Sequence, residues 1–534
     1  MLKCELFPLR KTNYSGIDGR KKLQVMAPPV RLYDAHFIPL PSQGNVYSLA
    51  FLQVERGVTK VLVASLKRKV YSLEYVQDDR GFLHPTVNEI PFTYLPEGSE
   101  IISVDAFNKS ENKEEMVVGL AIIKDVDRSD GKTSQYLNIY SDWEPEFGAS
   151  LLETLAQNWR HVELEFIPYQ LQHAVVEING ILDTCFLLSG SDKNIHLYVE
   201  DKPNQSFREE PLEPLFPEFA DLPSIVMWTN FYKDIPGTRI TALACECGYV
   251  RVSVVDLASL SVTFAWSATH DSPITSVRLF SLGTRLQTPG FVSAVLREPA
   301  DAAGGGPESL HLLVTKALWP SVVYSGLPLA EGEPPPRRHT LAESDVSDVV
   351  TCSCVCDINM DGRNEIVLGT YGQELLVYST QGDEWMQIWR FSFSQPLLAV
   401  TYVDLIGDGI NELVVLTNHG LHVLQHDTRE AAALCLQRRQ KLSGLTDGEL
   451  SRLLDAALRL ASPEAETAAS DTPAGGTADR SGDTATDKTG DPAGAADSQT
   501  GTVPSSPSAP DSGSSDSYPS SDDPVTPTFG PSIS

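Results

Sequence analysis

The sequence has few basic residues for its length. In 534 residues, 41 Lys and Arg stand against 71 Asp and Glu, which gives a formal net charge of −30. A chain this acidic repels phosphate backbones, which argues against nucleic-acid binding through a broad basic face. No apolar run approaches the ~18 residues of a membrane-spanning helix, and the N-terminal residues lack the apolar core of a secretory signal. We therefore expect a cytoplasmic protein that reaches membranes only through its partners.

Cysteines and catalytic motifs are also scarce. Eight cysteines in a chain this long do not indicate a disulfide scaffold. Cys352, Cys354 and Cys356 alternate, as do Cys245 and Cys247, and alternate residues of a strand project to one face. We expect these cysteines to pack inside a β-structure. The sequence contains no Gly-x-Ser-x-Gly, His-Glu-x-x-His or Gly-x-Gly-x-x-Gly motif, so we predict that the protein is not an enzyme.

What the sequence does contain is a repeated hairpin pattern. An apolar run, a short polar turn and a second alternating run are typical of a β-hairpin. The pattern recurs at 61–75, 116–143, 186–199, 243–255, 310–327, 366–379 and 413–426. Seven units at spacings of roughly 45–70 residues favour a repeat architecture over unrelated antiparallel sheets. We predict an all-β protein with one seven-bladed β-propeller at 42–426.

The flanking segments differ in composition. Residues 1–41 show no strong periodicity, and we expect a mostly flexible N-terminal extension. Residues 427–460 predict a helical C-terminal segment, which either packs under the propeller or binds a partner. Residues 461–534 are rich in Ser, Pro and Gly and carry twelve acidic against two basic residues. Such a composition predicts a disordered acidic tail. Residues 297–309 and 331–345 are Pro- and Gly-rich and predict loops at blade edges.

The most specific local motif is DINMDGRNE at 357–365. Asp357, Asn359 and Asp361 alternate, Gly362 permits a sharp turn, and Glu365 supplies a later carboxylate. Oxygen donors at this spacing build calcium loops, and a short loop between propeller strands is similar to the integrin-type FG-GAP repeat. These four oxygen-bearing residues are the candidate metal ligands. The alternative is a structural Asx-type turn that holds no metal.

A second copy of the motif, DLIGDGINE, follows at 404–412. Asp404, Asp408 and Glu412 match the first copy, but Ile406 stands at the third position and cannot bind a metal. We therefore expect this copy to be kept for its turn geometry. No cofactor is required by the sequence, and calcium at the first copy is the only one that the motifs indicate.

Longer segments resemble a known family. They include QGNVYSLAF (43–51), EIISVDAFNKS (100–110), FLLSGSDKNIHLY (186–198) and DGRNEIVLGTYGQELLVY (361–378). Together they are similar to the kaptin family over roughly residues 42–443. The resemblance rests on whole blade segments, and the N-terminal extension, the 297–309 insertion and the acidic tail lie outside it.

The resemblance implies a scaffold subunit of the KICSTOR complex, which recruits the GATOR complex to the lysosome and negatively regulates TOR signalling when amino acids or glucose are scarce. The implied partners are an integrin-FG-GAP-repeat subunit, an SZT-type scaffold and a small helical subunit. The alternative is an F-actin-binding protein of lamellipodia and stereocilia. Binding to an acidic filament would need a basic cluster such as Lys67–Lys69 or Arg438–Lys441.

Overall fold

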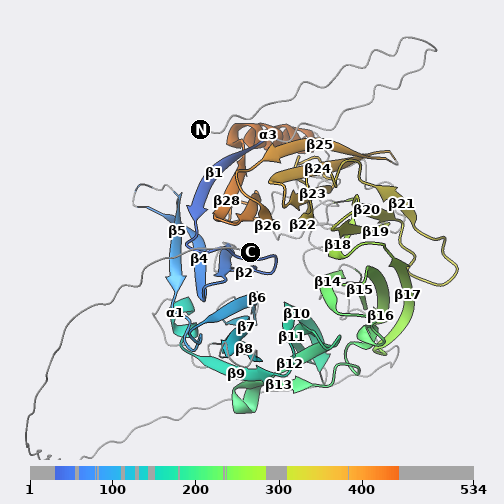
Figure 1. Ribbon diagram of the computed structural model, residues 1–534. Coiled ribbons are helices and arrows are strands. Elements are labelled where there is room, and N and C mark those ends of the chain that lie inside the picture. Colours follow the sequence, from blue (N-terminus) through green and yellow to red (C-terminus); the bar gives the residue numbers. More distant parts are fainter. Residues whose placement is uncertain are drawn as a thin grey trace, which may run out of the picture. The chain divides into compact units, whose positions relative to one another are not determined.

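The computed structural model describes residues 31–443, apart from 54–58, 79, 81–82, 110–114, 127–131, 142–150, 179–180, 233–234, 236, 284–308 and 383. These residues form seven four-stranded antiparallel sheets arranged around a central axis (Figure 1). The sheets are the blades of a β-propeller, numbered here 1 to 7 along the chain. The predicted seven-bladed propeller is therefore confirmed.

Blade 1 consists of β2 (Leu49–Gln53), β3 (Thr59–Ser65), β4 (Lys69–Gln77) and β5 (Leu83–Ile90). Blade 2 consists of β6 (Ser99–Asn108), β7 (Met116–Val126), β8 (Lys132–Ser141) and β9 (Trp159–Leu164). Blade 3 consists of β10 (Pro168–Ile178), β11 (Ile181–Gly190), β12 (Ile195–Asp201) and β13 (Ser206–Glu210). Blade 4 consists of β14 (Val226–Tyr232), β15 (Thr238–Cys245), β16 (Tyr249–Asp256) and β17 (Ser261–Thr269). Blade 5 consists of β18 (Ile274–Ser281), β19 (Leu310–Lys316), β20 (Val322–Ser325) and β21 (Arg337–Thr340). Blade 6 consists of β22 (Val350–Cys356), β23 (Glu365–Thr370), β24 (Glu374–Gln381) and β25 (Glu384–Ser392). Blade 7 consists of β26 (Leu397–Val403), β27 (Glu412–Thr417), β28 (Gly420–His426) and β1 (Leu32–Pro39).

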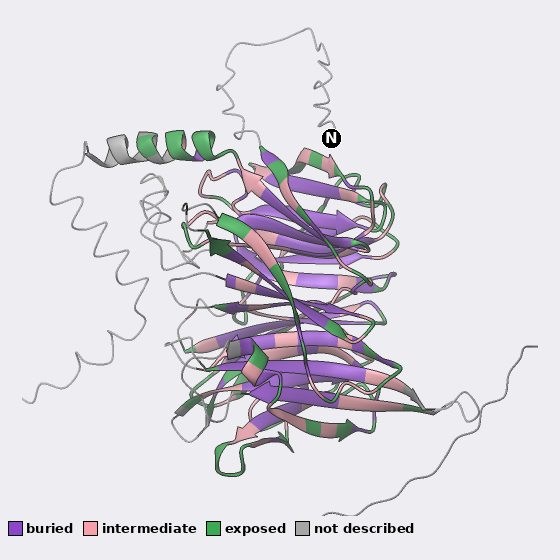
Figure 2. Cartoon of the chain, turned by 90° about the vertical axis from the view of Figure 1, so that its left-hand side faces the viewer, coloured by how far each residue is buried: buried purple, intermediate pink, exposed green. Residues whose placement is uncertain are grey.

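The two middle strands of each blade are the hairpins that the sequence predicts. A strand covered on both faces reads as a continuous apolar run, and all six residues of β27, ELVVLT, are buried. Outer strands face solvent on one side, so β17, SVTFAWSAT, has only exposed and half-buried residues. Figure 2 shows this change from buried to exposed strands. The apolar hairpins are thus the interior of each blade.

The hydrophobic core is divided into seven layers, one between each pair of neighbouring blades. Cys352, Cys354 and Cys356 lie in the layer between blades 6 and 7, and Cys245 lies between blades 3 and 4. The expectation that they pack inside the β-structure is confirmed for these four. It is wrong for Cys247, which is exposed because β15 ends at Cys245 and a turn follows.

The ring is closed by a strand from the other end of the sequence. β1 pairs antiparallel with β28, with Ile38 opposite Leu421, so it is the outer strand of blade 7 (Figure 1). The sequence predicts the propeller to begin at residue 42, and the structure corrects this boundary to Leu32. Only Leu32 and Ile38 of β1 are buried, which explains the weak periodicity of this segment.

Few helical elements accompany the strands in the described residues. α1 (Leu151–Leu155) packs between blades 1 and 2 through Leu152 and Leu155, and two 3-10 turns span Lys202–Asn204 and Pro217–Phe219. α3 (Thr428–Ser443) follows β28 and lies within the predicted helical segment. Residues 444–460 of that segment and residues 461–534 lie outside the described residues, as do residues 297–308 of the insertion. Residues 331–345 are not only a loop, because they include β21.

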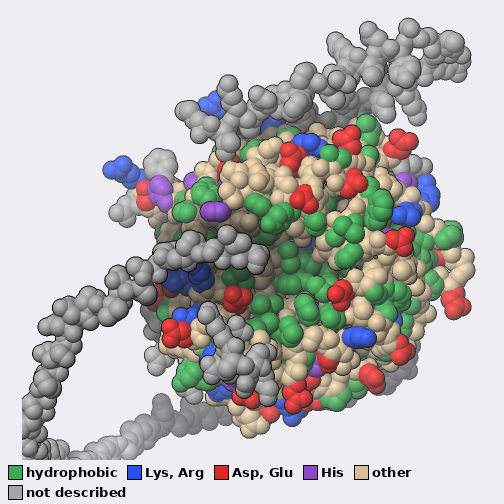
Figure 3. Space-filling view, viewed as in Figure 1, with side chains coloured by type: hydrophobic (Ala, Val, Ile, Leu, Met, Phe, Trp, Pro, Cys, Tyr) green, Lys and Arg blue, Asp and Glu red, His purple; other side chains and the backbone are tan. Residues whose placement is uncertain are grey.

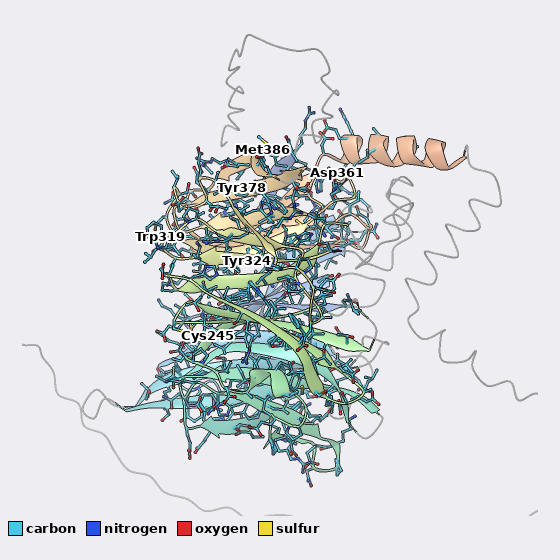
Figure 4. All side chains as sticks on the ribbon, turned by 90° about the vertical axis from the view of Figure 1, so that its right-hand side faces the viewer. Cys245, Trp319, Tyr324, Asp361, Tyr378 and Met386 are labelled. Atoms are coloured by element: carbon cyan, nitrogen blue, oxygen red, sulfur yellow. The ribbon has the colours of Figure 1, made fainter. Side chains whose placement is uncertain are left out.

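Strand order also defines two faces of the ring. The loops from first to second strand of a blade, and from third to fourth, lie on one face, which we call the FG-GAP face because it carries 357–364 and 404–411. The turns between the middle strands and the connections between blades lie on the opposite face. Figure 4 shows Asp361 and α3 on one side of the disc and Trp319, from the β19–β20 turn, on the other. No helix in the described part is long and apolar enough to cross a membrane.

Candidate functional site

The loop between β22 and β23 brings the four candidate ligands together through hydrogen bonds. Asp357 accepts the backbone N–H groups of Asp361 and Gly362, both at 2.8 Å. Asn359 Oδ1 accepts the same Asp361 N–H at 2.8 Å, and Asp361 Oδ1 accepts the N–H of Arg363 at 2.9 Å. Gly362 has φ +89°, a conformation that glycine adopts without steric cost. These are the contacts of an Asx-type turn.

The fourth candidate, Glu365, lies at the start of β23 and is fully buried. Its Oε2 accepts the N–H of Ile358 at 3.1 Å. Its Oε1 accepts the amide Nδ2 of Asn359 at 2.9 Å and the hydroxyl of Ser379 at 3.0 Å. Because it bonds to the beginning of the loop and to the next strand, Glu365 anchors the loop to the blade.

The second copy of the motif folds in the same way. Asp404 accepts the N–H groups of Gly407 and Gly409 at 2.7 and 2.8 Å, and Glu412 accepts the N–H of Leu405 at 2.9 Å. Glu412 is as buried as its counterpart in blade 6. The two loops therefore share one geometry although Ile406 replaces a polar residue in the second. The expectation that the second copy is kept for its turn geometry stays a prediction.

Both buried glutamates favour the neutral form. Burial, and next the charges of Asp361 and Asp357, raises the pKa of Glu365 to about 9. Burial, and to a smaller extent the charge of Asp408, raises the pKa of Glu412 to about 8. A protonated carboxyl is a poor ligand for a cation, and metal binding at such a group requires release of the proton. Calcium binding at Glu365 would therefore be coupled to release of its proton.

The side-chain amide of Asn359 links two of the candidate carboxylates. Asn359 Nδ2 donates to Glu365 and also to Asp361 Oδ2, at 3.1 Å. Among the described residues, no three His, Cys, Asp or Glu side chains are placed to hold a metal ion together. The hydrogen bonds of this loop fit the Asx-turn interpretation better than the metal interpretation. Calcium binding stays a prediction for experiment.

A pocket of about 750 Å³ opens on the opposite face, between the β11–β12 turn of blade 3 and the linker that follows β13. His196 stacks on Phe166 with ring centroids 3.7 Å apart and contacts Asp192 and Glu209 at 3.2 and 2.7 Å. The linker that follows β13 completes the wall, partly through the buried Phe216. No sequence motif indicates this pocket, because the residues that line it come from separate turns.

The linker is held by a buried ion pair. Glu218 and Arg239, only 2% and 7% exposed, form two parallel hydrogen bonds of 2.8 and 3.0 Å. The Arg239 guanidinium also lies over the Phe216 ring, 4.2 Å from its centroid, and donates to the carbonyl of Leu215. The wall of the pocket is therefore fixed to β15.

The basic cluster Lys67–Lys69 lies at the turn between β3 and β4, and two of its residues have partners. Lys69 pairs with Glu89 at 2.7 Å, and Arg68 donates to the carbonyl of Leu95 at 3.1 Å. The other cluster, Arg438–Lys441, lies in α3, where the side chains are outside the described set. None of the described contacts of this cluster involves the Lys67 side chain. An acidic filament would therefore compete with existing partners at Arg68 and Lys69 but not at Lys67.

Comparison with known proteins gives a family for this chain. A family model described as KICSTOR complex protein kaptin matches residues 32–436. A curated protein of the same description from Mus musculus is 40% identical over 419 residues, which cover 77% of this chain and 91% of the mouse protein. The match begins at the first residue of β1, so it includes the strand that closes the ring.

Solved structures with similar folds are more distant. Two crystal structures of BBS1N in complex with ARL6DN, soaked with mercury and with lead, have TM-scores of 0.45 and 0.44. Their sequences are 8% and 9% identical to this one, and the matches cover 75% of this chain and 98% of each of theirs. At this level of similarity they carry no argument about function.

Proposed function

Because the chain belongs to the kaptin family of KICSTOR complex proteins, we propose that it is a non-catalytic scaffold subunit of a KICSTOR complex. The observation that carries this proposal is the family match over the whole ring, from β1 into α3. A closed propeller with layered cores presents many loops on a rigid frame, and such surfaces suit protein contacts. Protein partners are therefore the expected ligands.

In detail, the chain would help recruit the GATOR complex to the lysosomal surface and restrain TOR signalling when amino acids or glucose are scarce. Its direct partners would be the FG-GAP-repeat subunit, the SZT-type scaffold and the small helical subunit of the complex. The chain would reach the membrane through these partners. F-actin binding has less support, since Lys69 and Arg68 already have partners within the ring.

The test is affinity purification of the tagged full-length chain from cells, followed by mass spectrometry of the proteins recovered. We expect the other KICSTOR subunits in amounts comparable to the chain itself, with the GATOR complex increased by amino-acid starvation. Co-sedimentation of the purified chain with F-actin tests the alternative. Recovery without any KICSTOR subunit, together with sedimentation on filaments, would overturn the proposal.

A further inference from the structure

Three loops on the face opposite the FG-GAP loops expose large apolar side chains. The β19–β20 turn carries Leu318 and Trp319, the β21–β22 connection carries Val346, and the β23–β24 turn carries Tyr371. These side chains are 50–69% exposed, and we call them the apolar loop patch. Trp319 lies at the edge of the disc away from α3 (Figure 4). Exposed apolar clusters on soluble proteins mark interaction sites more often than isolated residues do.

The three loops are tied to one another across blades 5 and 6. Ser344 Oγ accepts the N–H of Ser321 at 2.8 Å, which joins the connection to the β19–β20 turn. The N–H of Tyr371 donates to the carbonyl of Val349 at 2.8 Å, which joins the same connection to the β23–β24 turn. These hydrogen bonds therefore join the backbone of the three loops into one strip.

The backbone of this strip is held in unusual conformations. Glu343, Asp348 and Gln373 have φ of +61°, +65° and +70°, a region that non-glycine residues adopt infrequently. Gly372 approaches so closely that an added Cβ would lie 2.2 Å from the carbonyl oxygen of Ser347. A surface that is already held in one conformation loses less entropy on binding.

The charged groups around the patch are mixed in sign with an excess of carboxylates, because Lys316 at the end of β19 lies near Arg338, Asp345 and Asp271. The three loops contain Glu343, Asp345 and Asp348 and no lysine or arginine, and all three carboxylates are exposed. A fourth, Asp271, is exposed beside Ser272, whose hydroxyl accepts the N–H of Leu318. Figure 3 looks onto this face and shows hydrophobic side chains exposed among acidic and basic ones. A central apolar strip with an acidic rim is complementary to an apolar segment flanked by basic residues.

We propose that the apolar loop patch binds a segment of a protein partner in which apolar side chains are flanked by Lys or Arg. The proposal rests on the proposed scaffold function and names the surface and the partner chemistry. A second copy of this chain is a poor occupant, because a symmetric contact would place the acidic rims against each other. We expect Trp319 to contribute most of the binding energy. In many interfaces a central tryptophan, surrounded by contacts that exclude water, does so.

The first experiment places the photo-crosslinker p-benzoylphenylalanine at position 319 of the full-length chain in cells. The matched control places it at Leu182, which is 69% exposed on β11 of blade 3. We expect a crosslink from position 319, and not from 182, to a peptide of a KICSTOR subunit that contains apolar residues and Lys or Arg. A crosslink to a second copy of the chain or to an acidic peptide would overturn the proposal.

The second experiment measures recovery of that subunit with variants. Trp319→Ala should lower it by about tenfold or more, as for a central interface tryptophan, whereas Leu182→Ala should not. Replacing Asp345 and Asp348 by Lys should lower it and weaken its salt dependence, while Glu331→Lys, on the β20–β21 loop, should have no effect. A thermal melt confirms that each variant is folded.

The outcomes separate the two proposals. If every subunit is recovered with Trp319→Ala and with the charge variant as with the wild type, the docking proposal is wrong and the scaffold function stands. If the wild type recovers no KICSTOR subunit, the scaffold function is wrong and the docking proposal falls with it.

Discussion

The buried pair of Glu218 and Arg239 allows a quantitative prediction. Glu218→Ala would leave the Arg239 guanidinium buried with no carboxylate, and also remove the acceptor of the Thr241 hydroxyl, now at 2.9 Å. Removing one partner of a buried ion pair costs about 3–5 kcal/mol. Since whole domains are stable by only about 5–15 kcal/mol, this single change should bring the ring close to unfolding. The double variant Glu218→Met, Arg239→Met should recover most of that loss, because no charge then stays buried.

Urea unfolding followed by tryptophan fluorescence measures both variants at one pH. The matched control is Glu210→Ala, which removes the half-exposed partner of Arg208, and exposed pairs contribute only about 0–1 kcal/mol. A loss below about 1 kcal/mol for Glu218→Ala would refute the reasoning. The reasoning would also be refuted if the double variant lost as much free energy of unfolding as the two single variants added together. The coupling between Glu218 and Arg239 would then be absent.

Three further predictions concern other parts of the ring. If calcium occupies loop 357–365, it should raise the melting temperature of the wild type and not that of Asp361→Ala; an unchanged wild type contradicts the metal interpretation. Burial, and next the charges of His339 and Arg337, lowers the pKa of His311 to about 4. The unfolded chain therefore binds this proton first, near pH 6.5, and stability should fall from there toward pH 4 by up to about 1.4 kcal/mol per pH unit. His311→Leu should flatten this dependence in urea titrations, and an identical slope would count against it. Deleting residues 31–40 removes β1 and should lower the melting temperature and promote association on gel filtration, because β28 becomes an unpaired edge; an unaltered melt would show that closure is unimportant.

The sequence predicts the interior of the blades well and their edges poorly. Segments such as 413–426 are apolar because both faces of the strands are covered, and each predicted hairpin is the middle pair of a blade. Outer strands bury little, and β1 contains only two buried residues, so periodicity does not reveal them. Pairing of β1 with β28 is a contact between distant segments, and no local pattern encodes it.

The candidate site shows a different limit. The chain brings Asp357, Asn359 and Asp361 together in one loop with Glu365 at the start of β23, but the same spacing serves a metal cage and a hydrogen-bonded turn. The distinction depends on where each oxygen points, and in this loop the backbone N–H groups and the Asn359 amide bind them. Trp319 shows another limit, since the sequence Leu-Trp-Pro does not reveal that its turn is joined by hydrogen bonds to the loops that carry Val346 and Tyr371.

Because β1 pairs with β28, the propeller cannot close until the ribosome has synthesised β28. Ile38 is made early, whereas its partner Leu421 follows about 380 residues later. At roughly 5–20 residues per second, the first strand waits on the order of 20–80 s for its partner. During that interval blade 7 does not exist and blade 1 has one uncovered side. We expect nascent chains of this protein to engage chaperones until synthesis passes β28, and ribosome profiling of chaperone-bound nascent chains would show release at that point.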